Sequence, residues 1–353
     1  MALLTELMKK YKTVSVIGMA KNAGKTTTLN YLIEEAEDAG IVLGVTSTGR
    51  DGESKDIVTG TEKPKIYLYP GTFVSIPTGL FEYADAGLEI LRITKYHTAT
   101  GDVMLCRVVD GGFVQVAGPV LTRDQKAVSD EMLALGAGIV LIDGAIDRKA
   151  VASPENSDAI ILATGAVLSR NMQKVAEETA YLTSLYSLPQ IGDALAAAGP
   201  GSEDAAAIAD FLPLLKKSDR IILIRVDAEK NVHELEIKTG LGASSIIDSA
   251  IDEKTRYVYI PGAVTYGVLE NIQPKKFRHV TFLIKDATRI FLTAEEWKML
   301  SKKGFTLSTI NRINVAAVSV NPVSPRGYSF ESKELVGMIR KMIPDVMVTD
   351  VRT

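Results

Sequence analysis

A strand–helix–strand pattern near the start of the chain most constrains how this sequence folds. Thr13–Ile17 is a compact β-branched run of the kind that forms a buried strand. A glycine-containing loop, Gly18–Thr26, follows it, and the residues from Thr26 to about Ala39 repeat apolar side chains at helical spacing, with Gly40 placed to end the helix. Ile41–Thr46 then predicts a second strand. Because such a unit joins parallel strands, we expect an α/β fold with a mostly parallel sheet.

The loop Gly18–Thr26 fits the phosphate-binding pattern G-x-x-x-x-G-K-(S/T), in the strand-to-helix position that the pattern requires. Gly18 and Gly24 permit a turn whose N–H groups, with the helix N-terminus, cradle phosphate. Lys25 would bring a cation to the β- and γ-phosphates, and Thr26 a hydroxyl to Mg²⁺. The residues expected to bind nucleotide are Gly18, Asn22, Ala23, Gly24, Lys25, Thr26 and Thr27. The alternative is a plain glycine turn with a surface lysine.

Such a loop needs a second acidic group to hold Mg²⁺ or to orient the attacking water. Asp143 ends the apolar run Ile139–Asp143, as expected for an aspartate at the carboxyl edge of a parallel sheet. Asp51 follows the second strand, in Thr48–Glu53, and is the other candidate. We therefore expect Lys25, Asp51 and Asp143 to be catalytic, and Thr26, Asp51 and Asp143 to hold the metal. A turn-capping role for Asp143 and a solvated turn around Asp51 are the alternatives.

Several further loop residues follow predicted strands. Arg50 is a candidate phosphate contact, whereas Asp147 and Arg148 fit either catalysis or a surface ion pair. Gly118-Pro119 with Arg123 is interpreted as a structural turn. The stretch Asn321–Pro325 is also interpreted as a stiff turn, with a partner-binding loop as the alternative.

No strong motif in the sequence indicates which nucleotide base the protein binds. A guanine-selecting Asn-Lys-x-Asp element is missing, because Lys217-Ser218-Asp219 lacks the asparagine and precedes a predicted strand instead of following one. ATP is therefore favoured over GTP, without excluding GTP.

Composition narrows the classes of partner. Lys and Arg number 40 and Asp and Glu 43, for a net charge of −3, which argues against nucleic acid or an anionic membrane as the main partner. Cys106 is the single cysteine and lies in a predicted strand, so we expect a buried thiol. No Cys/His cluster has metal-ligand spacing, and neither a signal peptide nor a long apolar run is recognisable. These features predict a cytoplasmic protein.

The length of 353 residues suggests about two domains. We expect a first domain over residues 1–195, with a β-rich insertion at about 64–120, and a second α/β domain over 205–353. The Ala/Gly-rich stretch Leu195–Ala207 is the candidate linker. Within the insertion, Asp110–Gly112 predicts a hairpin turn between two strands.

Three segments together resemble P-loop NTPases of the signal-recognition/MinD/dethiobiotin-synthetase branch. They are Gly18–Thr28, Gly49–Glu53 and Leu141–Arg148. The resemblance covers about the first half of the chain and implies a P-loop NTPase fold with ATP or GTP and Mg²⁺ as cofactors. One group of this branch carries a dimer-bridging lysine directly after the first glycine. That position is Met19 here, so this role is not transferred to Lys21, and homodimer formation stays open.

Three motifs look more specifically like a clostridial family linked to amino-acid fermentation: Ala20–Thr28, Val116–Pro119 and Val320–Pro325. That family is regarded as the P-loop subunit of the reactivase of adenosylcobalamin-dependent lysine aminomutase. The resemblance implies a slow, partner-stimulated nucleotide hydrolase. Its partners would be an aminomutase client and a mismatch-repair-like ATPase. No Asp-x-His-x-x-Gly cobalamin signature is present, so any cobalamin role would be exercised through a partner.

Two other functions are compatible with the same residues. An ATP-dependent small-molecule kinase or ligase of this branch would use the same loop and carboxylates. A binding-only scaffold is the third interpretation, against which the intact Lys25, Thr26 and Asp143 argue.

Overall fold

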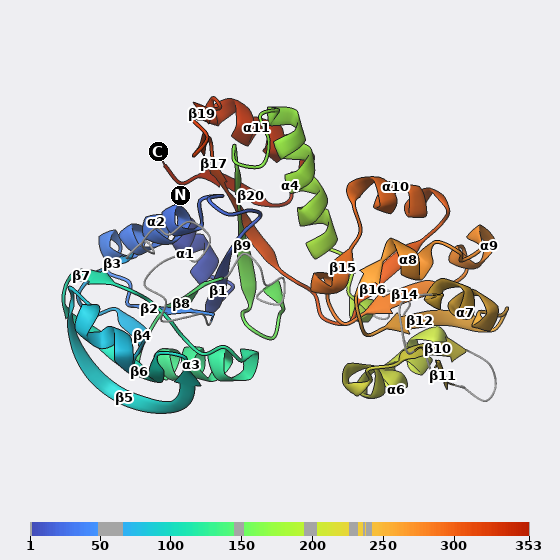
Figure 1. Cartoon of the computed structure of the whole chain (residues 1–353), viewed down its shortest axis with the longest axis horizontal. Helices are drawn as coiled ribbons and strands as arrows, with labels where there is room; N and C mark the ends of the chain where they lie inside the picture. Colours follow the sequence, from blue (N-terminus) through green and yellow to red (C-terminus); the bar gives the residue numbers. More distant parts are fainter. Residues whose placement is uncertain are drawn as a thin grey trace. The chain divides into compact units, whose positions relative to one another are not determined.

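The computed structural model of the chain describes residues 2–48, 66–144, 152–193, 203–225, 232–235, 237 and 242–352 (Figure 1). The chain divides into two compact units. The first unit comprises Met1–Thr183 and Asn314–Thr353, and the second unit comprises Ser184–Ile313. The last segment, expected in the second domain, therefore belongs to the first unit. A strand pattern in the sequence does not specify which sheet the strand joins, and here the final strands return to the first sheet.

A nine-stranded sheet forms the first unit. Its strands, from one edge to the other, are β20 (Met347–Asp350), β17 (Val315–Asn321), β9 (Ala159–Gly165), β1 (Thr13–Gly18), β8 (Ile139–Asp143), β2 (Leu43–Ser47), β4 (Phe73–Pro77), β6 (Gly101–Asp110) and β5 (Gly87–Thr98). Every neighbouring pair from β20 to β4 is parallel, and β6 and β5 add antiparallel strands at the edge. The mixed α/β class and the mostly parallel sheet are thus confirmed.

The β-rich insertion extends this sheet. β4, β6 and β5 come from it, while β3 (Ile66–Leu68) and β7 (Gly112–Val114) form a separate two-stranded sheet. The hairpin predicted at Asp110–Gly112, between β6 and β7, is wrong. β6 instead forms a hairpin with β5, through the turn between Thr98 and Gly101, and β7 pairs with β3. Gly112 is instead needed for packing: a Cβ there would lie 2.6 Å from the backbone nitrogen of Ala86.

Helices cover both faces of the parallel part of the sheet. Side chains that alternate along β8 show this: Ile139 and Leu141 pack into the cluster that contains the apolar residues of α1 (Leu3–Met8) and α2 (Lys25–Asp38). Val140 and Ile142 pack into the cluster that contains α3 (Thr122–Ala134). Successive residues of a strand point to opposite faces, so α2 and α3 lie on opposite faces of the sheet. Burial on both faces explains why this strand is a continuous apolar run.

A third cluster covers the sheet near β9 and β17, beneath α4 (Met172–Tyr186) and α11 (Ser332–Met342). The shorter elements of this unit are η1 (Thr78–Tyr83), β18 (Val323–Ser324) and β19 (Tyr328–Ser329). Among the described residues, no helix has both the length and the apolar character that crossing a membrane requires.

The second unit contains a five-stranded sheet in the order β11, β10, β12, β14, β16. Its strands are β10 (Ile221–Arg225), β11 (Val232–Leu235), β12 (Thr255–Ile260), β14 (Thr281–Ile284) and β16 (Thr306–Thr309). β12, β14 and β16 are parallel, and β10 is antiparallel to both its neighbours. The other elements are α6 (Glu203–Lys217), α7 (Ala243–Ala250), β13 (Val264–Thr265), α8 (Tyr266–Leu269), α9 (Pro274–Phe277), η3 (Ala287–Arg289), β15 (Ile290–Phe291) and α10 (Ala294–Lys302).

Helix α2 ends as its sequence predicts. Gly40 has a φ of +63°, and its N–H donates to the Glu37 carbonyl at 3.1 Å. The N–H of Ile41 donates to the Ala36 carbonyl at 2.8 Å. This pair of bonds satisfies carbonyls that the last helical turn would otherwise leave open.

The short helix α1 is held by a carboxylate from α2. Glu35 accepts the N–H groups of Leu3 at 3.0 Å and of Leu4 at 2.7 Å. No side chain of its own caps α1. An N-terminus of a helix leaves donors open and carries partial positive charge, so the distant carboxylate acts as its cap.

Replacing Glu35 by alanine is expected to lower the free energy of unfolding by about 1 to 3 kcal/mol, because two charge-assisted bonds to backbone N–H groups are lost. Amide hydrogen exchange of α1, together with thermal unfolding, measures the effect. Glu34→Ala is the matched control, since Glu34 is exposed on the same helix and makes no such bond. Equal protection of α1 in the two variants would contradict the assigned capping role.

Candidate functional site

The candidate site lies where β1, β8 and β2 end, at the carboxyl edge of the parallel strands. β1 ends at Gly18, and residues 19–24 connect it to α2. The N–H of Met19 donates to the Ala163 carbonyl of β9 at 2.9 Å, which fixes the start of this loop on the neighbouring strand. Ligands of open α/β sheets bind at this edge.

The loop adopts backbone conformations that its glycines allow. Gly24 has a φ of +104° and Asn22 a φ of +64°, and Asn22 is the one non-glycine with positive φ in the described part of the chain. A Cβ at Gly18 would lie 3.0 Å from Cγ of Lys25 and 3.1 Å from the Ala20 carbonyl oxygen. Gly18 therefore leaves the space through which the Lys25 side chain passes.

The N-terminus of α2 opens toward this loop. Gly24 is its N-cap residue and provides no side-chain cap, and Thr28 is the first residue whose N–H donates back to the Gly24 carbonyl, at 2.9 Å. The N–H groups of Lys25, Thr26 and Thr27 thus have no acceptor within the helix. Open donors at the positive end of a helix dipole suit a phosphate or another anion.

Lys25 and Asp143 meet in this site. The Lys25 Nζ atom lies 3.7 Å from Oδ1 of Asp143 and also donates to the carbonyl oxygen of Gly144. Both side chains retain partial exposure, 16% for Lys25 and 29% for Asp143. Parallel pairing of β1 with β8 places Val16 opposite Asp143, which explains why the two ends coincide. The structure thus brings together two of the residues predicted from the sequence, and their catalytic roles stay predictions.

The other acidic candidate, Asp51, lies outside the described residues, as do Arg50, Asp147 and Arg148. Their roles stay predictions. Among the described residues, no group of three or more His, Cys, Asp or Glu side chains is placed to hold a metal ion. Of the predicted metal-binding residues, Thr26 and Asp143 are described, and their binding of Mg²⁺ stays a prediction. Mg²⁺ often uses only one or two protein oxygens together with phosphate and water.

Asn321, which the sequence suggested was part of a structural turn, lies against the Gly18–Thr26 loop. A Cβ at Gly24 would be 2.9 Å from the Asn321 Cβ atom and 3.4 Å from its Nδ2 atom. Its Oδ1 atom accepts the N–H of Val323 at 3.1 Å. The side chain is therefore held with its amide nitrogen beside the loop. The sequence does contain a signal that could have identified Asn321 as a site residue. It is a polar residue at the end of an apolar strand, as is Asp143.

The strand that carries Asn321 also contacts the first turn of α2. The Thr28 hydroxyl donates to Oγ of Ser319 at 2.7 Å, and both side chains are buried. The α2 N-terminus is consequently braced by β17 as well as by β1.

The turn at Gly118 is a packing feature, in agreement with the sequence interpretation. A Cβ there would lie 2.5 Å from the Ser47 carbonyl oxygen, 2.5 Å from Oγ1 of Thr46 and 3.0 Å from Oε1 of Gln125. Thr46 in turn receives a hydrogen bond from Nε2 of Gln125 at 3.1 Å. Only glycine permits this approach to the end of β2.

Cys106 takes no part in the site. It lies in β6 with no exposed surface, and burial raises the pKa of its thiol to about 11. A neutral, buried thiol is a poor nucleophile, so the expected structural role fits.

Comparison of the chain with protein-family models, curated proteins and solved structures found no match.

Replacing Gly118 by alanine is expected to cost about 1 to 3 kcal/mol of stability, because the new methyl group collides with backbone that cannot move independently of β2. Urea unfolding measures the loss. Gly337→Ala in α11 is the control: no atom lies within 4 Å of its Cβ position, and alanine favours a helix interior. Unchanged stability of the Gly118 variant would show that the loop relaxes.

Proposed function

We propose that this chain binds a nucleoside triphosphate with Mg²⁺, ATP in preference to GTP, and hydrolyses it slowly. The observation that carries the proposal is the strand–loop–helix at Gly18–Thr26, with left-handed Asn22 and Gly24 and open N–H donors on α2. A P-loop NTPase fold accounts for this arrangement. The mostly parallel sheet and its helix-covered faces are compatible with it.

Each residue of the site has a defined task under this proposal. The loop N–H groups and the start of α2 hold the phosphates, and Lys25 turns from the Gly144 carbonyl toward them. Thr26 and Asp143 would hold Mg²⁺, and the ion would supply positive charge to balance the negative charge of the phosphates. Asp51 is proposed as the residue that positions the water or assists the metal. Asn321 supplies a further amide donor beside the loop.

Connectivity supports the idea that hydrolysis drives a conformational change. The chain leaves the second unit at Ile313 and enters β17, which reaches the phosphate loop at Asn321. The Thr28–Ser319 bond ties this strand to α2. A ligand that shifts α2 therefore acts on a strand directly continuous with the second unit, and differential affinity for two conformations is what a nucleotide-driven switch requires.

The client proposed from the motif resemblance is an adenosylcobalamin-dependent aminomutase, reactivated together with a mismatch-repair-like ATPase. This step is supported by the motifs Ala20–Thr28, Val116–Pro119 and Val320–Pro325 alone. Recovery of turnover by an inactivated aminomutase, with and without this protein and ATP, tests it. Equal recovery in both reactions would reject this client and leave the nucleotide proposal in place.

Lys25→Ala is expected to weaken ATP binding about 10- to 100-fold, because one charge-assisted contact to phosphate is lost. Calorimetric titration with MgATP and MgGTP measures it. Lys10→Ala is the control and should bind as the parent protein does, because Lys10 is exposed and precedes β1, whereas the loop follows the other end of that strand. Failure of the parent protein to bind either nucleotide would overturn the proposal.

Asp143→Asn is expected to reduce Mg²⁺-dependent hydrolysis by about tenfold or more, because the neutral amide is a poorer ligand for the ion. Nucleotide binding without Mg²⁺ should persist. Measuring phosphate release at varied Mg²⁺ concentration distinguishes a loss of metal binding from a loss of nucleotide binding.

The kinase or ligase function has its own test. Stimulation of hydrolysis in the parent protein by a small acid or alcohol, instead of by a protein, would favour it.

A further inference from the structure

One face of the small sheet formed by β3 and β7 is aromatic. Ile66, Leu68 and Val114 pack into the core cluster that also contains residues of α1 and α2. Tyr67 and Phe113 alternate with these residues and pair directly across the two strands, so they point to the other face of the sheet. Their ring centroids lie 5.3 Å apart in an edge-to-face contact. Figure 1 shows this sheet beside α2 in the first unit.

Tyr83 extends this aromatic surface. The segment that follows η1 runs beside β7, where the N–H of Asp85 donates to the Phe113 carbonyl at 2.8 Å. Tyr83 is 66% exposed, Phe113 46% and Tyr67 39%. In the described part of the chain four aromatic side chains are exposed, and the fourth is Phe291 in the second unit. Exposed aromatic side chains are thus concentrated on Tyr67, Tyr83 and Phe113, which we call the aromatic face.

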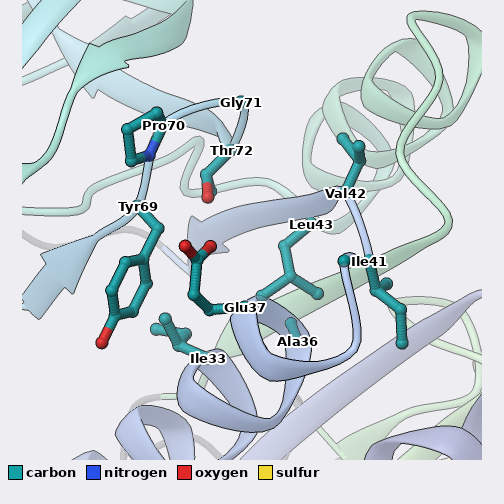
Figure 2. Close-up of a pocket in the computed structure, with 11 residues that line it drawn as sticks. Ile33, Ala36, Glu37, Ile41, Val42, Leu43, Tyr69, Pro70, Gly71 and Thr72 are labelled. Carbon is teal, nitrogen blue, oxygen red and sulfur yellow. The ribbon is translucent and has the colours of Figure 1, made fainter.

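The aromatic face is a surface and not a cavity. Tyr69 contacts Tyr67 at its border, with ring centroids 5.1 Å apart. Beside Tyr69 lies a pocket of about 150 Å³, which Glu37 and Thr72 also line (Figure 2). Small-molecule sites are usually larger, at about 300 to 1,000 Å³. Exposed tyrosine and phenylalanine side chains are instead typical of contacts between proteins.

The charge around the aromatic face is negative. Every charged residue that the structure describes within three positions of its members in the sequence is acidic: Glu82, Asp85 and Asp110. At the border, burial raises the pKa of Tyr69, with smaller contributions from the charges of acidic residues on α2. A second copy of this face, a nucleic acid or an anionic membrane would each bring like charge to it, which is unfavourable. The aromatic face therefore fits a positively charged partner.

We propose that the aromatic face docks an arginine-containing segment of another protein. The planar guanidinium group stacks on aromatic rings and forms paired hydrogen bonds with carboxylates, so arginine suits both features of this surface. Lysine carries the same charge but lacks the planar group. A single exposed cation–π contact strengthens binding only about two- to fivefold, so several arginines along the segment would contact the face together. This inference does not rest on the proposed nucleotide function.

The test uses the full chain and two fluorescent peptides of equal charge, hexa-arginine and hexalysine, with fluorescence anisotropy as the measure of binding. Hexa-arginine is expected to bind saturably and about threefold or more tighter than hexalysine, because only the guanidinium group stacks on the rings. The double variant Tyr83→Ser, Phe113→Ser should weaken hexa-arginine binding about fivefold or more, with the net charge unchanged. Phe291→Ser, which removes the exposed aromatic side chain of the second unit, is the control and should bind as the parent protein does.

The proposal fails on any of three results: no saturable binding of hexa-arginine, equal affinity of the parent protein for both peptides, or undiminished affinity in the double variant. Equal affinity would mean that charge alone is recognised. Thermal unfolding of each variant checks that the fold is retained. If the double variant unfolds, Tyr83→Ser alone, at the most exposed ring, takes its place and should weaken hexa-arginine binding about twofold or more.

Discussion

Parallel pairing of β17 with β9 is the interaction on which the rest of the first unit depends. It brings a strand from the end of the chain into the sheet, where Val318 and Val320 are buried. The same pairing places Asn321 beside Gly24 and Ser319 beside Thr28. The Gly18–Thr26 loop is thus surrounded by residues from two distant parts of the sequence. Without β17, the loop would lose the support on one side of α2.

Strict steric limits hold the loop in place. Gly18 leaves room for Lys25, and a Cβ at Gly165 would lie 2.0 Å from the Asn321 carbonyl oxygen. These glycines permit close approaches between strand ends, while the left-handed Asn22 and Gly24 turn the chain into α2. Conformational restriction of this kind preorganises N–H donors before a ligand arrives, which lowers the entropy cost of binding.

Local patterns in the sequence predicted where individual strands and helices lie, but they did not predict which strands pair with one another. The β-branched run of β1, the end of α2 at Gly40 and the approach of Lys25 to Asp143 follow from spacing and parallel pairing. The partners of β17 and β7 could not be derived, because a short apolar strand fits many sheets equally well. Asn321 was missed for the same reason: its position beside Gly24 depends on which strand pairs with β9.

The interrupted first unit has a consequence for biosynthesis. Residues 184–313 form one continuous stretch, so the second unit has all its strands available as soon as that stretch leaves the ribosome. The sheet of the first unit cannot be completed at that stage, because β17 and β20 are synthesised after the whole of the second unit. During that interval the edge of β9 that β17 later covers is open, and an unpaired strand edge attracts other strands. Prompt folding of the intervening unit, which shortens the distance to be closed, would limit this exposure.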